Sequence, residues 1–515
     1  MLRRAARFLR REAWVIVLTL LALFTRLAWN LVIHPPREFV FSDMLGYYGR
    51  AEDLVKQPLT ATHDYLSFYP WGTHAFLGVV KWLFVKPGTC PRELKDTIIA
   101  PAACAPMDVA LALLGTLGVF YTILIARRLT RGGPAAHGAP GAALSARRRW
   151  VYVPIGLLAV FYYPFLSQGG YYLSEGPFFA GLAATTYHGL RLADLGKKRD
   201  ALLFGLFAGL TAIVRPQVLL SLVFMALLWL FRRRHLRGAT LPRLLLAGLP
   251  LSLILIFSAV RTTRHIRAHD PNEFALVATN DTLNYAFGRC HPTSFEARAR
   301  GYRAFFGPPS LGALHSSAKT RRKEGLWVPL ELLPAFPPDP QCDGNKKRAE
   351  RKEPPEPCIL IEGKMWDRDI LGDVARSCVK QTGLARQAYF AATHVLLGFG
   401  FNVVWPDSGH KLTERTFLGV RVMWGRPVMA AFQVGFGITI LPFAVIAAFL
   451  SFTRRRARDA VLVTHIWGTV VVSMIYFGET RLRTPYDFLF LILGVDLLSR
   501  LFTWIGRKTT ATLAR

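Results

Sequence analysis

The sequence contains no CxxC pair, no compact group of cysteine and histidine residues, no internal repeat and no heptad array. A zinc site therefore has no support, and neither a solenoid nor a coiled coil is expected. Acidic residues are scarce, because 33 Asp and Glu stand against 64 Lys and Arg, a formal net charge of +31. Much of the basic charge falls in short blocks between apolar runs, a pattern typical of membrane topology signals. No nucleic-acid partner is expected.

Long apolar runs dominate the chain, which is 52% hydrophobic. The first run, 13–33, approaches the ~20 residues that span a bilayer. No cleavage site follows it, so it reads as a retained signal anchor. The positive-inside rule assigns the basic blocks and both termini to the cytoplasm. We predict an all-α polytopic membrane protein with about ten transmembrane helices and an extracytoplasmic mixed cap. The predicted spans are 13–33, 107–126, 151–168, 176–192, 201–214, 216–231, 243–260, 428–452, 459–477 and 487–506.

This topology divides the chain into alternating membrane and external parts. Within the spans, Arg215-Pro216 interrupts 201–231 and predicts two short helices that meet at a polar tip, because proline breaks or kinks a helix. The apolar segment 387–405 is expected to be an interfacial or re-entrant helix. The five parts are 1–33 (cytoplasmic N-terminus and first span), 34–106 (first periplasmic loop, with interfacial helices), 107–260 (membrane helices two to seven), 261–427 (periplasmic segment with an interfacial helix) and 428–515 (C-terminal membrane helices and cytoplasmic tail).

All the cysteines fall in the two external segments. An even number confined to one side of the membrane predicts disulfides in an oxidising compartment such as the bacterial periplasm, whereas the alternative is a chance distribution of thiols. The sequence does not determine the pairing. The six residues are Cys90, Cys104, Cys290, Cys342, Cys358 and Cys378.

Asp43 follows the first span, on the side of the membrane opposite the basic N-terminus, and is a candidate active-site base. If the segment is helical, Tyr47 lies near Asp43 and Arg50 lies near Tyr47, because residues three or four apart share a helix face. The alternative is a solvated surface helix with Asp43 at its N-terminal cap.

Two further polar points lie in external turns. Glu175 either caps the helix that follows it or lines a polar cavity. Arg481 and Arg483 present planar guanidinium groups suited to a lipid phosphate, at a position where positive residues are under-represented. The alternatives are ion pairs with Glu479 or Asp487, or contact with lipid headgroups.

Several short motifs resemble, in order and sidedness, the landmarks of GT-C glycosyltransferases. The nearest branch contains dolichyl-phosphate-mannose protein mannosyltransferases and bacterial aminoarabinose transferases. The motifs are Asp43 in the first external loop and the segments 172–179 (YLSEGPFF), 209–216 (GLTAIVRP), 278–288 (ATNDTLNYAFG) and 479–485 (ETRLRTP).

The resemblance implies transfer of a sugar from a polyprenyl-phosphate carrier to a lipid, glycan or protein acceptor, with anomeric inversion. The active site would face the periplasm from the bacterial inner membrane, in contact with membrane lipids. Asp43 would be the base. The substrate-binding residues would be Tyr47, Arg50, Glu175, Arg215, Arg481 and Arg483.

The chain departs from the family pattern at one acidic position. Met44 follows Asp43 where relatives often have a second acid, so Glu52, Asp53 or an acid from another loop would assist. No metal ligand set is assigned, and a divalent metal ion is left open as a cofactor. Two other functions stay open: an O-antigen or polysaccharide ligase-like enzyme, and a non-enzymatic lipid or polysaccharide transporter.

Overall fold

The structure is a computed structural model that describes most of the chain. The described residues are 2–56, 68–90, 100–130, 141–232, 236, 238–267, 274–289, 326–329, 350–352, 358–361, 368–400, 403–407, 415–417, 420–422, 425–453, 457–476 and 478–513.

Four helices in this part of the chain are long and apolar enough to cross a membrane: Glu12–Glu38, Ala102–Thr130, Leu241–Arg267 and Thr480–Ile505. Two bent pairs, Val151–Phe161 with Tyr163–Gly169 and Gly425–Thr439 with Leu441–Ser451, raise the number to six if each pair is one span. The prediction of a mainly helical chain is therefore confirmed, and the described residues contain four to six candidate membrane spans. The number ten and the mixed cap stay predictions, in part because helices such as 198–214 and 218–232 are shorter than the ~20 residues of a standard span.

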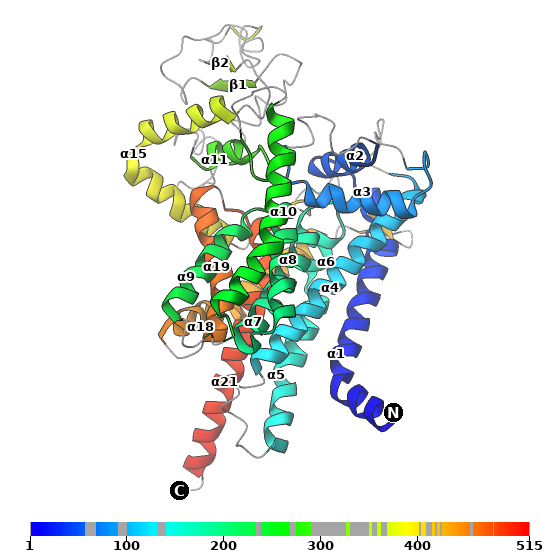
Figure 1. The fold of residues 1–515 in the computed structure, drawn as a ribbon, viewed down its shortest axis with the longest axis vertical. Coiled ribbons are helices and arrows are strands. Elements are labelled where there is room, and N and C mark those ends of the chain that lie inside the picture. The colour runs from blue at the N-terminus through cyan, green and yellow to red at the C-terminus, as the bar shows by residue number, and fades with distance from the viewer. Residues whose placement is uncertain are drawn as a thin grey trace.

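The helices pack into a bundle whose core lies where apolar side chains of α1, α4, α5, α7 and α21 meet. Figure 1 shows the start of α1 and the end of α21 at one end of the molecule, and α2, α3, α11, β1 and β2 toward the other. The helices of the bundle are α1 (Leu2–Ala28), α4 (Ala105–Thr130), α5 (Gly141–Phe161), α6 (Tyr163–Gly169), α7 (Glu175–Leu195), α8 (Lys198–Val214), α9 (Val218–Arg232), α10 (Leu241–Arg267), α17 (Gly425–Thr439), α18 (Leu441–Thr453), α19 (Ala457–Ile475) and α21 (Asp487–Leu513).

The remaining elements lie mostly in the two segments predicted to be external. The helices are α2 (Asp43–Lys56), α3 (Gly72–Phe84), α11 (Asp281–Arg289), α15 (Arg368–Gly398) and α20 (Thr480–Arg483), with short turns η1 (Trp29–Ile33), η2 (Pro36–Glu38), η4 (Ala102–Cys104) and η7 (Thr484–Tyr486). Two antiparallel pairs of strands complete the described part, β1 (Leu326–Pro329) with β2 (Cys358–Ile361) and β3 (Arg415–Phe417) with β4 (Val420–Val422). In α15, Gly383 has φ 72°, and this left-handed residue divides the segment into two helices.

The predicted break at Arg215-Pro216 is confirmed, because α8 ends at Val214 and α9 begins at Val218. A close backbone contact fixes α3 beside this break. A Cβ atom on Gly72 would lie 2.8 Å from the carbonyl oxygen of Ile213, so only glycine fits there without a backbone shift. The first turn of α3 is thereby held next to the end of α8, near Arg215.

One disulfide, Cys90–Cys104, closes a loop in the described part of segment 34–106, which the sequence predicts to be external. The side chains of the other four cysteines are outside the described residues, so their pairing stays open. Both sulfur atoms are buried beside the Tyr48 hydroxyl, which lies 3.2 Å from the Cys90 Sγ atom. The disulfide ties the connection after α3 to the start of α4.

Removing this crosslink should destabilise the fold. A closed loop of this length lowers the entropy of the unfolded chain by the equivalent of about 3 kcal/mol. We expect the double substitution Cys90→Ser/Cys104→Ser to lower the midpoint of thermal unfolding in detergent. Dithiothreitol should also lower the unfolding midpoint of the wild type. It should lower the unfolding midpoint of the variant by a smaller amount. Equal midpoints for variant and wild type would show that the crosslink does not stabilise the folded protein.

Candidate active site around Asp43

Asp43 is the first residue of α2, and one face of this helix carries the polar side chains predicted from the sequence. The Tyr69 hydroxyl donates a hydrogen bond to the Asp43 Oδ1 atom at 3.1 Å. The Tyr47 ring stacks on the Tyr69 ring, with centroids 5.1 Å apart, and the Arg50 Cζ atom lies 4.6 Å from the same ring. The helical spacing predicted for Asp43, Tyr47 and Arg50 is confirmed, and all three contact Tyr69.

Arg481 connects Asp43 to a second carboxylate. Its Nη1 atom donates to the Asp43 Oδ2 atom at 3.1 Å, and its Nε atom donates to the Oε1 atom of Glu175. Arg215 donates to the same Glu175 oxygen at 2.5 Å and, through Nε, to the Ser174 Oγ atom at 2.8 Å. Five elements far apart in the sequence therefore meet here: the start of α2, the segment before α3, the start of α7, the α8–α9 break and α20.

The two carboxylates differ in exposure and hence in what they can do. The Asp43 side chain is 32% exposed, whereas that of Glu175 is 0% exposed. Burial by itself would raise the pKa of Glu175, but the charges of Arg215 and Arg481 outweigh burial and hold this pKa at about 2. Glu175 is thus a fixed buried anion that positions two arginines, and Asp43 is the carboxylate that a substrate can reach.

The buried Glu175 anion should make stability sensitive to acid. Because its folded-state pKa of about 2 lies below the ordinary 4.5, the ion pair contributes stability above pH 4.5 and loses it as the pH falls toward 2. The contribution is on the order of 3 kcal/mol. We expect Glu175→Gln to unfold at a lower temperature than the wild type at neutral pH, with a smaller further drop in acid. If the unfolding temperature of Glu175→Gln falls with acid as steeply as that of the wild type, groups other than Glu175 cause the acid sensitivity.

Glu479 lies beside this cluster and has the opposite electrostatic character. Burial raises its pKa, and the negative charges of Glu175 and Asp43 raise it further, although Arg481 partly opposes them. Glu479 immediately precedes α20. It is therefore a candidate for the assisting acid from another loop, which the sequence did not identify. Of the two neighbours considered in α2, Glu52 forms an ion pair with Lys81, and Asp53 is buried.

The structure leaves Arg483 out of the Asp43 cluster. Its Nε atom donates to the Asp487 Oδ1 atom at 2.9 Å, and its Nη2 atom donates to the Gln433 Oε1 atom at 2.6 Å. Asp487 also accepts a hydrogen bond from the Tyr162 hydroxyl at 2.8 Å. The ion pair with Asp487, one of the alternatives from the sequence, is therefore what the structure shows. The residues brought together are Asp43, Tyr47, Arg50, Glu175, Arg215 and Arg481.

Arg261, near the end of α10, was not predicted from the sequence. It is 4% exposed, and none of its three side-chain nitrogens has a hydrogen-bond partner among the described residues. Its Cζ atom lies 5.4 Å from the centroid of the Trp71 ring, and the Trp71 indole is fixed by a 2.9 Å hydrogen bond to Ser258. A buried arginine without a counter-charge is costly and calls for an anionic partner. Arg261 could have been predicted, because it is a basic residue at the predicted external end of a predicted span. The same pattern identified Arg481 as a candidate.

His74 extends this second polar group toward Asp43. It is fully buried, and neither ring nitrogen has a hydrogen-bond partner among the described residues. Burial, followed by the positive charges of Arg261 and Arg50, lowers the pKa of His74 well below its ordinary value. The imidazole is therefore neutral and retains one N–H donor. Since Arg50 also contacts Tyr69, the Arg261 group and the Asp43 cluster are neighbours.

Among the described residues, no group of three or more His, Cys, Asp or Glu is arranged to hold a metal ion. No protein-family model matches the chain, and no curated protein matches it in sequence. Among solved structures, the crystal structure of ArnT from Cupriavidus metallidurans in the apo state is matched with a TM-score of 0.35 and 12% identity, over 94% of this chain and 78% of that chain. At this TM-score, the similarity carries no argument about fold or function.

Proposed function

We propose that this protein is a membrane glycosyltransferase that moves a sugar from a polyprenyl-phosphate carrier to an acceptor at the periplasmic face of the bacterial inner membrane. The observation that carries the proposal is an accessible carboxylate, Asp43, close to a buried arginine, Arg261, that no described residue compensates. Asp43 is oriented by Tyr69 and Arg481, and Arg261 lies near the end of α10, one of the candidate membrane spans. These are the two groups that displacement of a lipid phosphate by an acceptor requires.

In the proposed reaction, Asp43 takes the proton from the acceptor nucleophile as that nucleophile attacks the anomeric carbon. The new bond forms on the face opposite the phosphate, the bond between the anomeric carbon and the phosphate oxygen breaks, and the electron pair leaves with polyprenyl phosphate. The product therefore has the inverted anomeric configuration. Arg481 and Tyr69 hold both Asp43 oxygens, so the carboxylate is positioned before the acceptor arrives.

Arg261 is the residue that we assign to the phosphate. Guanidinium groups match phosphate oxygens with paired N–H donors, and all the side-chain nitrogens of Arg261 are available within the described residues. Arg215 supplies another donor, because its Nη1 atom is buried and has no partner among the described residues. These donors would stabilise the charge that develops on the departing phosphate. This assignment replaces the pair of Arg481 and Arg483. Arg481 donates to Glu175 and Asp43, and the Nε and Nη2 atoms of Arg483 donate to Asp487 and Gln433.

The test is sugar transfer by the purified protein in nanodiscs, supplied with a panel of radiolabelled polyprenyl-phosphate sugars and a membrane extract as acceptor source. We expect one donor to give labelled product and free polyprenyl phosphate in equal amounts. Transfer only from a diphosphate-linked polysaccharide would favour the ligase instead. Movement of intact donor between leaflets without bond cleavage would favour the transporter.

A further inference from the structure

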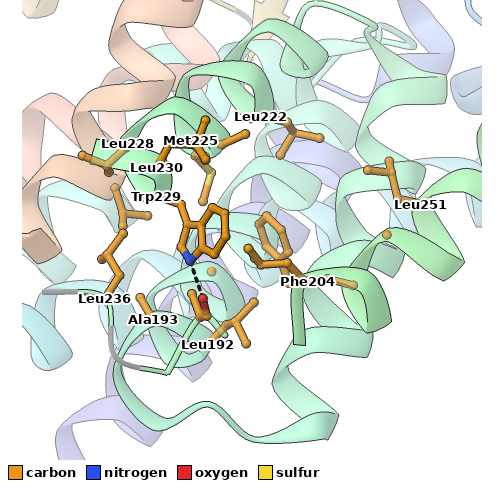
Figure 2. Close-up of a pocket in the computed structure, with 17 residues that line it drawn as sticks. Leu192, Ala193, Phe204, Leu222, Met225, Leu228, Trp229, Leu230, Leu236 and Leu251 are labelled. Carbon is orange, nitrogen blue, oxygen red and sulfur yellow. Dashed lines mark hydrogen bonds between the residues drawn. The ribbon is translucent and has the colours of Figure 1, made fainter. Parts of the chain in front are cut away.

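An apolar cavity of about 350 Å³ lies between α7, α8, α9 and α10, in the half of α10 remote from Arg261. Figure 2 shows Leu192, Phe204, Met225 and Trp229 directed into the same space. The one polar atom of the Trp229 side chain already has a hydrogen-bond partner. Its indole Nε1 atom donates to the Ala239 carbonyl oxygen, as the dashed line in Figure 2 marks. The described residues place no free polar side-chain group in this lining, and such an apolar lining suits a hydrocarbon rather than ordered water.

The rim of the cavity belongs to the apolar outer surface of the bundle. Phe231 follows the last lining residue of α9, Leu230, and is 84% exposed. On α10, Leu245 and Leu249 are also exposed. They directly follow the lining residues Leu244 and Gly248. Since α10 is one of the candidate membrane spans, the cavity borders the part of the surface that lipid chains would contact.

The distance along α10 from Arg261 to the cavity limits which lipid chains can reach the cavity. The stretch of helix from Gly248 to Arg261 is about 20 Å long. A chain confined to one leaflet covers only about half of the ~30 Å hydrocarbon core, or about 15 Å. A lipid whose phosphate lies at Arg261 therefore reaches the cavity only if its chain is longer than a phospholipid acyl chain, as a polyprenyl chain is.

We infer that this cavity binds the distal part of the isoprenoid chain of the lipid donor. The inference rests on the proposed function for the identity of the donor. The chain runs from the phosphate at Arg261 along the exposed apolar face of α10, through Phe257 and Leu253, and inserts between Trp229 and Leu251. The cavity thereby selects donors by chain length, at a site remote from the chemistry.

Gly248→Phe is the substitution that tests the cavity. A Cβ atom at Gly248 has no other atom within 4 Å, so the phenyl ring can occupy the cavity without displacing the backbone. The matched control is Gly435→Phe on α17, a helical glycine that is exposed and whose Cβ position is also open. We expect Gly248→Phe to raise KM about tenfold for a sugar donor built on undecaprenyl phosphate. This change corresponds to a lipid chain that loses on the order of 60 Å² of apolar burial in the cavity. It should leave KM for the geranyl-phosphate donor unchanged, and the control should change neither. An equal effect on both donors, or on neither, would overturn the inference.

A second measurement does not depend on transfer. Undecaprenyl phosphate with a photoreactive diazirine at the end of its chain should label peptides of α9 and α10 in the wild type and in Gly435→Phe, and not in Gly248→Phe. Labelling of these peptides only by a phospholipid with the diazirine on its acyl chain would overturn the inference. Labelling by undecaprenyl phosphate without sugar transfer from any donor would instead contradict the proposed function and leave the cavity assignment intact.

Discussion

Asp43→Asn should abolish sugar transfer while the protein still folds and inserts. The substitution keeps the size of the side chain and can keep the hydrogen bond from Tyr69, but it removes the carboxylate that accepts the proton of the acceptor. General-base catalysis contributes roughly 10²–10⁴-fold, so we expect kcat to fall by about that factor. The measurement is the initial rate of transfer with saturating donor, at matched amounts of purified protein.

The control for this prediction is Glu38→Gln, in the short turn η2 that precedes α2. The Glu38 side chain is 31% exposed, close to the 32% of Asp43, and it also lies near an arginine, Arg37. Glu38→Gln should retain the wild-type rate. Full activity in Asp43→Asn would remove Asp43 as the base, and a similar loss in both variants would point to a general effect of neutralising an external carboxylate.

Arg261→Ala should have the second large effect, on donor binding. Hydrogen bonds to a charged group are worth about 1.5–3 kcal/mol, so losing the phosphate contact should raise KM for the donor by between about ten- and a hundred-fold. Arg261→Lys should recover part of this loss, because lysine keeps the charge but not the paired donors. Arg264→Ala is the control, since Arg264 lies one turn further along α10 and is exposed.

Thermal unfolding separates this binding role from a structural one. Without ligand, Arg261 is a buried charge that no described residue compensates, so Arg261→Ala should raise the unfolding midpoint of the ligand-free protein. Undecaprenyl phosphate should stabilise the wild type and not the variant, because a ligand stabilises only the protein that binds it. A lower midpoint in ligand-free Arg261→Ala would show that Arg261 supports the fold and would contradict its assignment to the phosphate.

The sequence predicted local features of the site well, for a physical reason. The helical period places Asp43, Tyr47 and Arg50 on one face, and Arg215-Pro216 interrupts the helix wherever the rest of the chain lies. The contacts of these residues with Tyr69 and Glu175 join positions far apart in the chain. They depend on tertiary packing, such as the close approach of Gly72 to Ile213, which no spacing in the sequence reveals.

Arg481 and Arg483 show the limit of reasoning from composition alone. The sequence assigned both residues to one phosphate because both stand in the same short turn. In the structure they lie in one helical turn, α20, and residues two apart on a helix do not face the same way. Arg481 therefore meets Asp43 and Glu175, whereas Arg483 is directed toward Asp487 and Gln433 in the core.

The central claim is direct displacement of a lipid phosphate by an acceptor activated at Asp43. The most direct test is the anomeric configuration of the sugar in the product, measured by proton NMR after transfer by the wild-type protein from a donor of known configuration. The account predicts complete inversion, because a single displacement occurs at the anomeric carbon. Retention of configuration would require two displacements and would contradict the role given to Asp43.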